Sequence, residues 1–238
     1  MSSPTRRPVT MISRSELAAF EARTQLSAEL RCSLPFASCY AYAPRATGLL
    51  ASAARLLCRR VKACDPLWLP RYARCVVELM ASEPAFVRLL GRGDAWLIPV
   101  PGSTRTTPMY WAAWQLATAL QALGAARGVW PGLVREFPVR KSATALLGER
   151  PTVPQHYGSL AVIEARAPPG RLILVDDVIT RGRTLLAAAA RLRRSLPHAD
   201  IRAFALVRTL GFLDRIDRVL APCEGVVYWA GGDVRREP

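Results

Sequence analysis

The sequence contains no long uninterrupted hydrophobic run, and this absence argues against a membrane-spanning protein. Its longest apolar stretches, such as 49–57 and 185–190, contain arginine or end well short of the about 20 residues that a transmembrane helix needs. Residues 1–24 mix arginines with Glu16 and Glu21 and have no continuous apolar core. We therefore expect neither a secretory signal peptide nor a transit peptide, and we expect a cytoplasmic protein without membrane contact.

Closely paired cysteines are also lacking. No two of the six cysteines are separated by two residues, which is the spacing that structural zinc sites favour. Without a secretion signal, a disulfide framework is not expected either. We therefore expect buried free thiols, at Cys32, Cys39, Cys58, Cys64, Cys75 and Cys223.

Lysine is nearly absent from a strongly basic chain. Of the 33 Lys and Arg residues only Lys62 and Lys141 are lysines, and the formal net charge is +15. Such a charge attracts polyanions, including nucleotide phosphates and nucleic acid. The excess of arginine, together with abundant alanine, leucine and proline, is also typical of coding bias. The charge therefore leaves open both a merely solvated basic surface and a groove for a polyanion.

What is present predicts a globular protein with one ordinary domain and a helical extension. Of the 238 residues, 51% are hydrophobic and 21% are charged, which excludes a disordered chain. Residues 1–91 predict a mostly helical N-terminal extension or hood, because apolar residues recur there at helical spacing. Its expected helices cover 15–30, 44–63 and 70–90, with one strand over 38–42.

Residues 92–238 predict an α/β core domain in which strands and helices alternate. Such alternation favours a parallel open sheet flanked by helices. The expected strands are 95–100, 133–139, 159–165, 172–175, 201–207 and 225–230, the expected helices are 108–127, 184–195 and 210–220, and 140–157 is expected to be a loop.

The most informative pattern lies in residues 171–185. A short buried strand ends at Asp176 and Asp177, and the carboxyl ends of parallel strands are where ligands bind in open α/β sheets. The turn 180–184 then enters an alanine-rich helix. Its backbone N–H groups and the helix dipole form an anion cradle, Gly182 permits close backbone approach, and two threonine hydroxyls add donors.

Carboxylates beside a phosphate cradle fit one class of ligand, a sugar phosphate. The sugar hydroxyls suit the carboxylates, and the phosphate suits the turn. The alternative, in which the aspartates only cap a helix and brace a turn, explains one aspartate but not the Thr-x-Gly-x-Thr pattern that follows.

This segment resembles the 5-phosphoribosyl-1-pyrophosphate (PRPP) signature of type I phosphoribosyltransferases, and the order of elements from about 92 to 230 is similar to the core of that family. The resemblance implies the type I phosphoribosyltransferase fold. It also implies that Asp176 and Asp177 contact the ribose hydroxyls, directly or through Mg²⁺ and water, so that any metal contact is indirect. The residues implied for the 5′-phosphate are Thr180, Arg181, Gly182, Arg183 and Thr184.

Two further segments match the family by position. The turn after the first core strand stands where the family binds pyrophosphate, and 139–157 stands where it has a flexible cationic loop. By themselves, both patterns are also common in ordinary surface loops. The resemblance implies pyrophosphate binding by Gly102, Ser103, Thr104 and Arg105, and catalytic roles for Asp176, Asp177, Arg105, Arg140 and Lys141, the three cations stabilising the leaving pyrophosphate.

Within the family, the chain resembles most the ComF-like group, which is also similar to amidophosphoribosyltransferases. It departs from that group in having no N-terminal cysteine-rich zinc module and in having Arg183 where small residues are common. The likeness spans about residues 38–210 and is carried by 40–42, 49–62, 98–101, Gln155 and 173–180.

The resemblance implies Mg²⁺-dependent transfer of phosphoribose from PRPP to a nitrogen nucleophile, with release of pyrophosphate. The acceptor, a base or an amine, is left open, and residues 40–75 and 208–232 are the candidate hood over it. A homodimer is expected only by analogy. The alternative function is a non-catalytic PRPP or nucleotide sensor, or a DNA-uptake accessory protein that binds nucleic acid.

Overall fold

The computed structural model describes residues 25–91, 93–104, 108–140, 150–163, 168 and 170–238. Within these residues, nine strands lie in two sheets. The strands are β1 (Ser33–Tyr42), β2 (Trp96–Pro99), β3 (Gly128–Val129), β4 (Leu133–Arg135), β5 (Leu160–Val162), β6 (Arg171–Ile179), β7 (Asp200–Thr209), β8 (Leu220–Trp229) and β9 (Val234–Glu237). The helices are α2 (Leu49–Lys62), α3 (Leu69–Ser82), α4 (Pro84–Leu90), α5 (Ala112–Ala122), α6 (Val153–Gly158) and α7 (Arg183–Ser195), with a 3-10 turn at Pro108–Tyr110.

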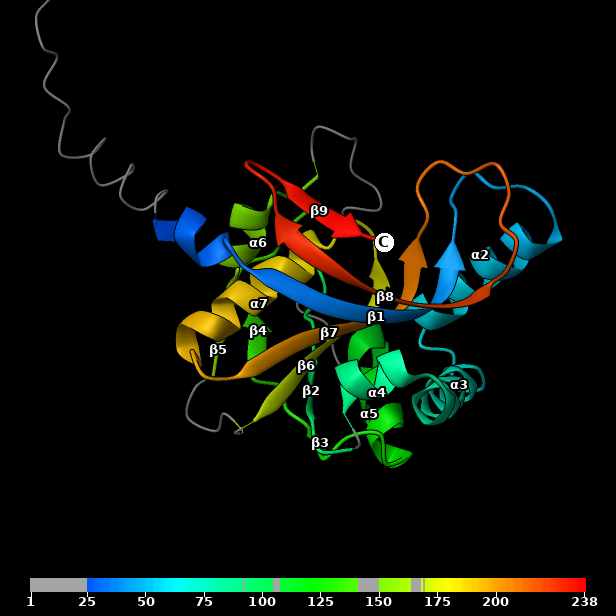
Figure 1. Ribbon diagram of the computed structural model, residues 1–238, viewed down its shortest axis with the longest axis horizontal. Coiled ribbons are helices and arrows are strands. Elements are labelled where there is room, and N and C mark those ends of the chain that lie inside the picture. Colours follow the sequence, from blue (N-terminus) through cyan, green and yellow to red (C-terminus); the bar gives the residue numbers. More distant parts are fainter. Residues whose placement is uncertain (1–24, 92, 105–107, 141–149, 164–167, 169) are drawn as a thin grey trace, which may run out of the picture.

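The main sheet has seven strands in the order β3-β2-β6-β7-β1-β8-β9 (Figure 1). The first five of these are mutually parallel, whereas β8 runs antiparallel to β1 and β9 antiparallel to β8. The expected α/β architecture, a mostly parallel sheet flanked by helices, is confirmed. The carboxyl ends of β2, β6, β7 and β1 therefore lie along one edge of the sheet.

The N-terminal part of the chain belongs to this same sheet. β1 pairs with β7 on one side and with β8 on the other, so residues before 92 supply an inner strand as well as helices. The expected strand 38–42 is the second half of this longer strand. The expected helix 15–30 lies mostly outside the described residues, of which 25–30 are helical.

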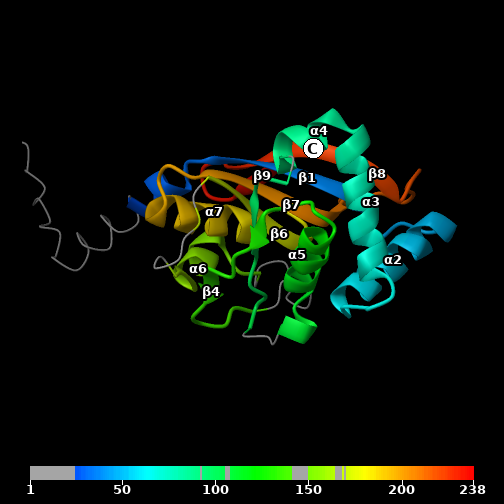
Figure 2. The ribbon, with the colours of Figure 1, turned by 90° about the horizontal axis from the view of Figure 1, so that it is seen from below.

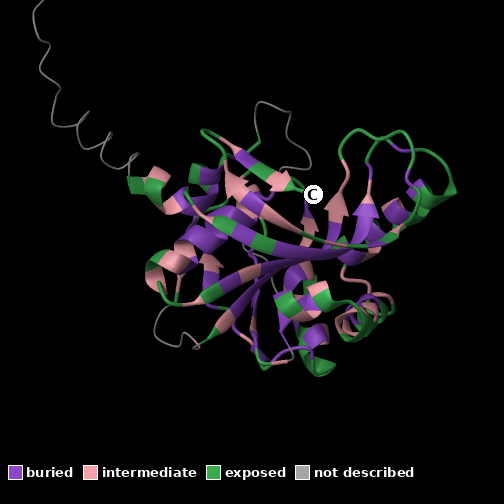
Figure 3. Ribbon diagram, in the orientation of Figure 1, coloured by how far each residue is buried: buried purple, intermediate pink, exposed green. Residues whose placement is uncertain are grey.

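Helices cover both faces of the sheet (Figure 2). Along β6, Leu172 and Leu174 pack with α7, α6 and the small β4–β5 sheet, whereas Ile173 and Val175 pack with α2 to α5. A strand covered on both faces contains consecutive apolar residues, which explains the run of four at 172–175. Figure 3 shows the resulting continuous burial along the middle strands.

Helix α2 buries only part of the apolar spacing that predicts it, since Leu57 and Val61 are buried. Leu49, Leu50 and Leu56 are exposed, although they belong to the apolar spacing that predicts the helix. Ala51 and Ala54 complete the buried side of α2 and pack in one cluster with Ala43 and Ala46, which follow β1. The apolar spacing therefore identifies the helix but defines its buried face only in part.

Several expected element boundaries were wrong. The helix 70–90 is divided between α3 and α4 at Glu83, which is extended because Pro84 follows it. Residues 140–157 include α6, whose first turn is capped by Thr152. The strands 133–139 and 159–165 are shorter, and they pair antiparallel with each other outside the main sheet.

The segment 210–220 is an irregular connection and not the expected helix. Gly211 has a positive φ of 69°, and the carbonyl of Asp214 accepts a hydrogen bond from Thr47 N–H at 2.9 Å, so the backbone is bound to another loop. Within the described residues, no helix combines the length and hydrophobicity needed to cross a bilayer.

Candidate functional site

Two segments singled out in the sequence meet at the carboxyl edge of the sheet. β2 and β6 are adjacent parallel strands, and Val100 N–H donates to the Val175 carbonyl at 2.8 Å just beyond β2. The turn that begins at Pro101 therefore starts beside the end of β6, where Asp176 and Asp177 lie. This edge is the usual ligand-binding position of an open parallel sheet.

The two aspartates form a closely spaced acidic pair. Asp177 N–H donates to Asp176 Oδ1 at 2.9 Å, and Val178 N–H donates to Asp177 Oδ1 at 2.9 Å. Burial and the neighbouring Asp177 carboxylate raise the pKa of Asp176 well above its usual range, while the Lys62 ammonium opposes that rise. Hydroxyl groups or a cation bound at this pair would relieve the cost of holding two carboxylates together.

The turn between β6 and α7 requires glycine. Gly182 has a φ of 87°, and a Cβ atom built on it would lie 2.7 Å from Val227 Cγ1. Helix α7 begins directly afterwards at Arg183, and Leu186 N–H donates to the Gly182 carbonyl at 2.9 Å. The described structure therefore contains the predicted sequence of carboxylates, glycine turn and helix N-terminus at the end of one strand.

Arg181 and Arg183 brace this turn against the β8–β9 connection. Arg183 donates from Nε to Asp233 Oδ1 at 2.8 Å and from Nη2 to Asp233 Oδ2 at 2.5 Å, and Arg181 Nη1 reaches Asp233 Oδ2 at 2.9 Å. The hydrogen bonds from Arg183 lower the pKa of Asp233 to about 2. Since both guanidinium groups bind this carboxylate, the turn backbone and the hydroxyls of Thr180 and Thr184 are the better candidates for a phosphate.

The turn after β2 is held by a buried arginine that the sequence analysis did not single out. Arg135, at the end of β4, is only 5% exposed, and it donates to the carbonyls of Gly102 and of Pro101, the latter at 3.3 Å. It also donates to the Ser159 hydroxyl. Burial lowers the pKa of Arg135 to about 10, whereas the nearby Asp176 carboxylate acts in the opposite direction. Arg135 is therefore linked to both segments of the site.

His156 on α6 is a second buried polar residue at the site that was missed. It is 4% exposed, and its Nε2 lies 3.4 Å from Thr184 Oγ1 in the turn after β6. Burial, with contributions from Arg135 and Arg183, lowers its pKa to about 4, so the ring is neutral near pH 7. Arg135 lies in an expected strand and His156 in an expected loop, and the residues beside them in the sequence, such as Glu136 and Gln155, give no signal that either is buried.

Of the remaining predicted site residues, some lie in the described part of the chain and others do not. Arg105 and Lys141 lie outside the described residues. Gly102 and Thr104 are exposed at the edge, and Ser103 is partly exposed there, with its carbonyl accepting from Val139 N–H at 2.8 Å. The exposed Arg140 follows Val139 directly, so the beginning of the cationic loop adjoins the turn after β2.

The donor set at the site suits magnesium bound through a ligand. Among the described residues there is no group of three or more His, Cys, Asp and Glu side chains that could hold a metal by itself. Mg²⁺ is commonly bound by one or two carboxylates together with substrate oxygens and water. Asp176 and Asp177 supply two adjacent carboxylates of this kind at the end of β6.

Comparison with known proteins adds no family assignment. No protein-family model matches the chain, and no curated protein is significantly similar to it in sequence. The signature residues and the geometry of the carboxyl edge are therefore the features that indicate a function.

Proposed function

We propose that the protein is a Mg²⁺-dependent phosphoribosyltransferase of the type I fold that binds PRPP at the carboxyl edge of β2 and β6. The observation that carries the proposal is the arrangement of three adjoining segments: the carboxylate pair, the glycine turn into α7, and the turn after β2. These segments match, in order, the ribose hydroxyls, the 5′-phosphate and the pyrophosphate of one ligand.

In this assignment, Asp176 and Asp177 accept hydrogen bonds from the ribose 2′- and 3′-hydroxyls. The backbone of the turn 180–184 and its threonine hydroxyls bind the 5′-phosphate at the positive end of α7. The turn 102–104 binds pyrophosphate, and Arg135 acts as a positioning residue because it fixes two carbonyls of that turn. Arg105, Arg140 and Lys141 stay proposed as charges for the leaving group.

The reaction is a displacement at the anomeric carbon of ribose. A nitrogen of the acceptor donates its electron pair to form the new C–N bond, and the C–O bond to pyrophosphate breaks with its electron pair leaving on oxygen. The proton of the acceptor nitrogen is released to water. Magnesium, when bound with PRPP, supplies positive charge to the diphosphate and the ribose oxygens. The protein orients the sugar and stabilises the leaving charge.

Calorimetric titration with PRPP, with and without Mg²⁺, tests this proposal. We expect Mg²⁺-dependent binding that the double variant Asp176→Asn/Asp177→Asn weakens at least about 100-fold, since both contacts to the ribose are changed. Asp200→Asn is the matched control, because Asp200 begins β7 at the opposite edge, where it pairs with Arg171 and Arg202. Absence of binding at millimolar PRPP contradicts the proposal.

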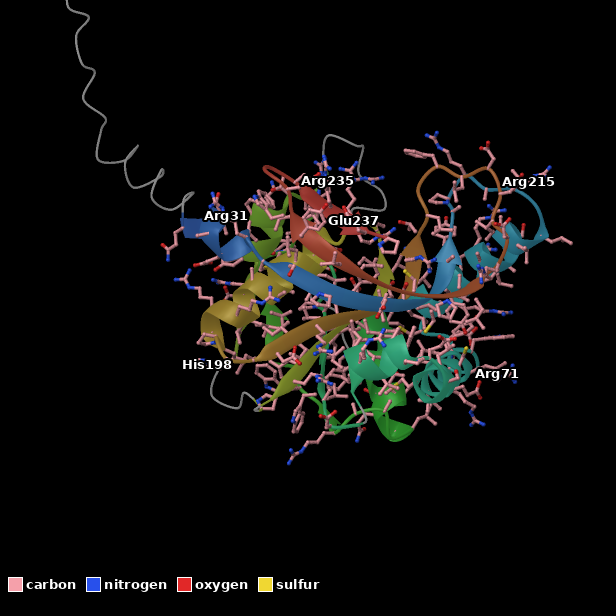
Figure 4. All side chains as sticks on the ribbon, viewed as in Figure 1. Arg31, Arg71, His198, Arg215, Arg235 and Glu237 are labelled. Atoms are coloured by element: carbon pink, nitrogen blue, oxygen red, sulfur yellow. The ribbon has the colours of Figure 1, made fainter. Side chains whose placement is uncertain are left out.

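Nucleic-acid binding is the second candidate, favoured by the net charge of +15. Arg60 lies over the Trp68 ring at 3.9 Å and Arg45 over the Phe212 ring at 4.2 Å, an arrangement that nucleic-acid-binding surfaces also use. However, labelled arginines such as Arg71 and Arg215 point outward at separate places around the molecule (Figure 4). Binding of this kind should fall steeply with salt and be insensitive to the aspartate variants. If the protein binds PRPP but releases no pyrophosphate from it in the presence of any base or amine, it would instead be a sensor.

A further inference from the structure

A pocket of about 410 Å³ lies between α2 and the carboxyl end of β6, outside the three segments assigned to PRPP. Its walls are Tyr42, Arg55, Cys58, Arg59, Lys62 and Val178. Tyr42 ends β1, and Val178 directly follows Asp177 in β6. The pocket therefore opens beside the carboxylate pair, within the residues expected to form the hood.

The charged residues of this pocket are all cationic and come from one helix. Arg55, Arg59 and Lys62 are spaced by four and three residues along α2, so they share one side of the helix. No carboxylate is among the lining residues, and the rest of the wall is a tyrosine ring, a thiol and a valine. Such a lining fits a small ligand that combines a flat or apolar body with a negative group.

The three cations differ in whether their side chains already form hydrogen bonds within the protein. Arg55 donates to the Ala46 carbonyl at 2.7 Å and to the Ser52 hydroxyl at 3.1 Å, which holds it in place. Arg59 and Lys62 are exposed at the pocket, and neither forms a side-chain hydrogen bond or ion pair with any residue in the described part of the chain. They are the groups left to bind a ligand.

Electrostatic interactions also link the pocket to the carboxylate pair. Burial raises the pKa of the Cys58 thiol to about 11; the Lys62 ammonium opposes the rise, and the Asp177 carboxylate adds to it. The ammonium and the carboxylate are thus both close enough to affect one buried thiol. Since Asp177 is near, a ligand with a single negative charge is better accommodated than one with two.

We propose that this pocket holds the acceptor, and that the acceptor is a small monoanionic carboxylate bound by Arg59 and Lys62 with its body against Tyr42 and Cys58. The identification as an acceptor rests on the proposed function. The assignment of an anion-binding pocket rests on the lining itself.

Two probe pairs that differ only in charge test the pocket: nicotinate with nicotinamide, and 4-aminobenzoate with 4-aminobenzamide. Binding of each probe is measured by calorimetry or ligand-observed NMR in the absence of PRPP. For at least one pair we expect the carboxylate to bind about tenfold more tightly than the amide, as a charge-assisted hydrogen bond allows. Arg59→Gln/Lys62→Gln should reduce this preference to about twofold or less.

The matched control is Arg71→Gln/Arg74→Gln, which removes the same charge from exposed positions on α3 and should keep the preference. Thermal unfolding of both double variants checks that the fold is intact. Equal binding within both pairs, no binding of any probe, or a preference that survives Arg59→Gln/Lys62→Gln overturns the proposal.

PRPP titration of the unmodified protein separates this proposal from the function. If PRPP binds with Mg²⁺ but neither pair shows the charge preference, the acceptor assignment fails and the proposed function stands. If the preference is present and PRPP does not bind, the pocket is an anion site and the proposed function fails.

Discussion

Two regions build the carboxyl edge in different ways. The β6–α7 region does so with consecutive residues: carboxylates, a glycine turn and a helix N-terminus follow one another within 176–184. The β4–α6–β5 region does so with isolated buried side chains, since Arg135 reaches the turn after β2 and His156 reaches Thr184. The first region supplies groups for a ligand, and the second holds the supporting turns.

This difference separates what a local pattern specifies from what tertiary contacts specify. The positive φ of 87° at Gly182 is a property of the turn itself, although the distant Val227 of β8 also leaves no room for a Cβ atom. Arg135 acts only through hydrogen bonds to residues that lie 24 to 34 positions away in the chain. Variants in the two regions should therefore differ in whether stability or ligand binding is changed more.

The largest effect on stability is expected from Arg135→Met. The substitution leaves the Pro101 and Gly102 carbonyls and the Ser159 hydroxyl without their donor in a buried place. We expect a loss of about 3 kcal/mol in the free energy of unfolding, measured with urea. The control Arg235→Met removes an exposed arginine of β9 and should change stability by less than about 0.5 kcal/mol. Equal effects of the two variants would show that Arg135 does not hold the turn.

The next largest effect is expected in the pH dependence of stability, to which His156 contributes. Its folded pKa of about 4 lies below the unfolded value, so the unfolded state binds the proton more readily. The stability due to the neutral ring is therefore complete above about pH 6.5 and is lost as the pH falls toward 4. His156→Gln should flatten this part of the stability profile by about 2 kcal/mol relative to the unmodified protein.

The other histidine provides the control for that experiment. His198 is exposed in the connection between α7 and β7 (Figure 4), and His198→Gln should leave the profile between pH 6.5 and 4 unchanged. If both histidine variants alter the profile equally, the burial argument for His156 is wrong.

A loss of stability smaller than that of Arg135→Met is expected from Gly182→Ala in the turn before α7. The positive φ and the close approach to Val227 should together cost about 2 kcal/mol. Gly170→Ala is the matched control, since Gly170 has a φ of 95° but nothing within 4 Å of its Cβ position, and it should cost about 1 kcal/mol. PRPP binding should be weakened by Gly182→Ala alone. A smaller loss for Gly182→Ala than for Gly170→Ala would contradict the packing argument.

The same distinction explains how far the sequence predicts the fold. The buried run 172–175 and the alternation of strands and helices correctly predict a mostly parallel sheet covered on both faces. The inner position of β1 could not be predicted, because its partners β7 and β8 lie more than 150 residues away in the chain. A single sequence contains no pairing information over that distance.

The misassigned segment 210–220 has a related cause. Its apolar residues recur at helical spacing, yet Phe212 and Leu213 are exposed and only Ile216 is buried, against the alanines near α2. Periodicity describes which residues could share a face, whereas the backbone bond from Thr47 to Asp214 decides the actual path. For the site, the sequence predicted the consecutive residues 176–184 but not Arg135, His156 or the position of Lys62.

The central claim is that the carboxylate pair and the turns beside it bind PRPP as one ligand. Its most direct test is the PRPP titration of the unmodified protein, Asp176→Asn/Asp177→Asn and Asp200→Asn, each with and without Mg²⁺. The account predicts Mg²⁺-dependent binding that is retained in Asp200→Asn and lost in the double variant. Binding that is equal in all three proteins, or absent from the unmodified protein, would contradict it.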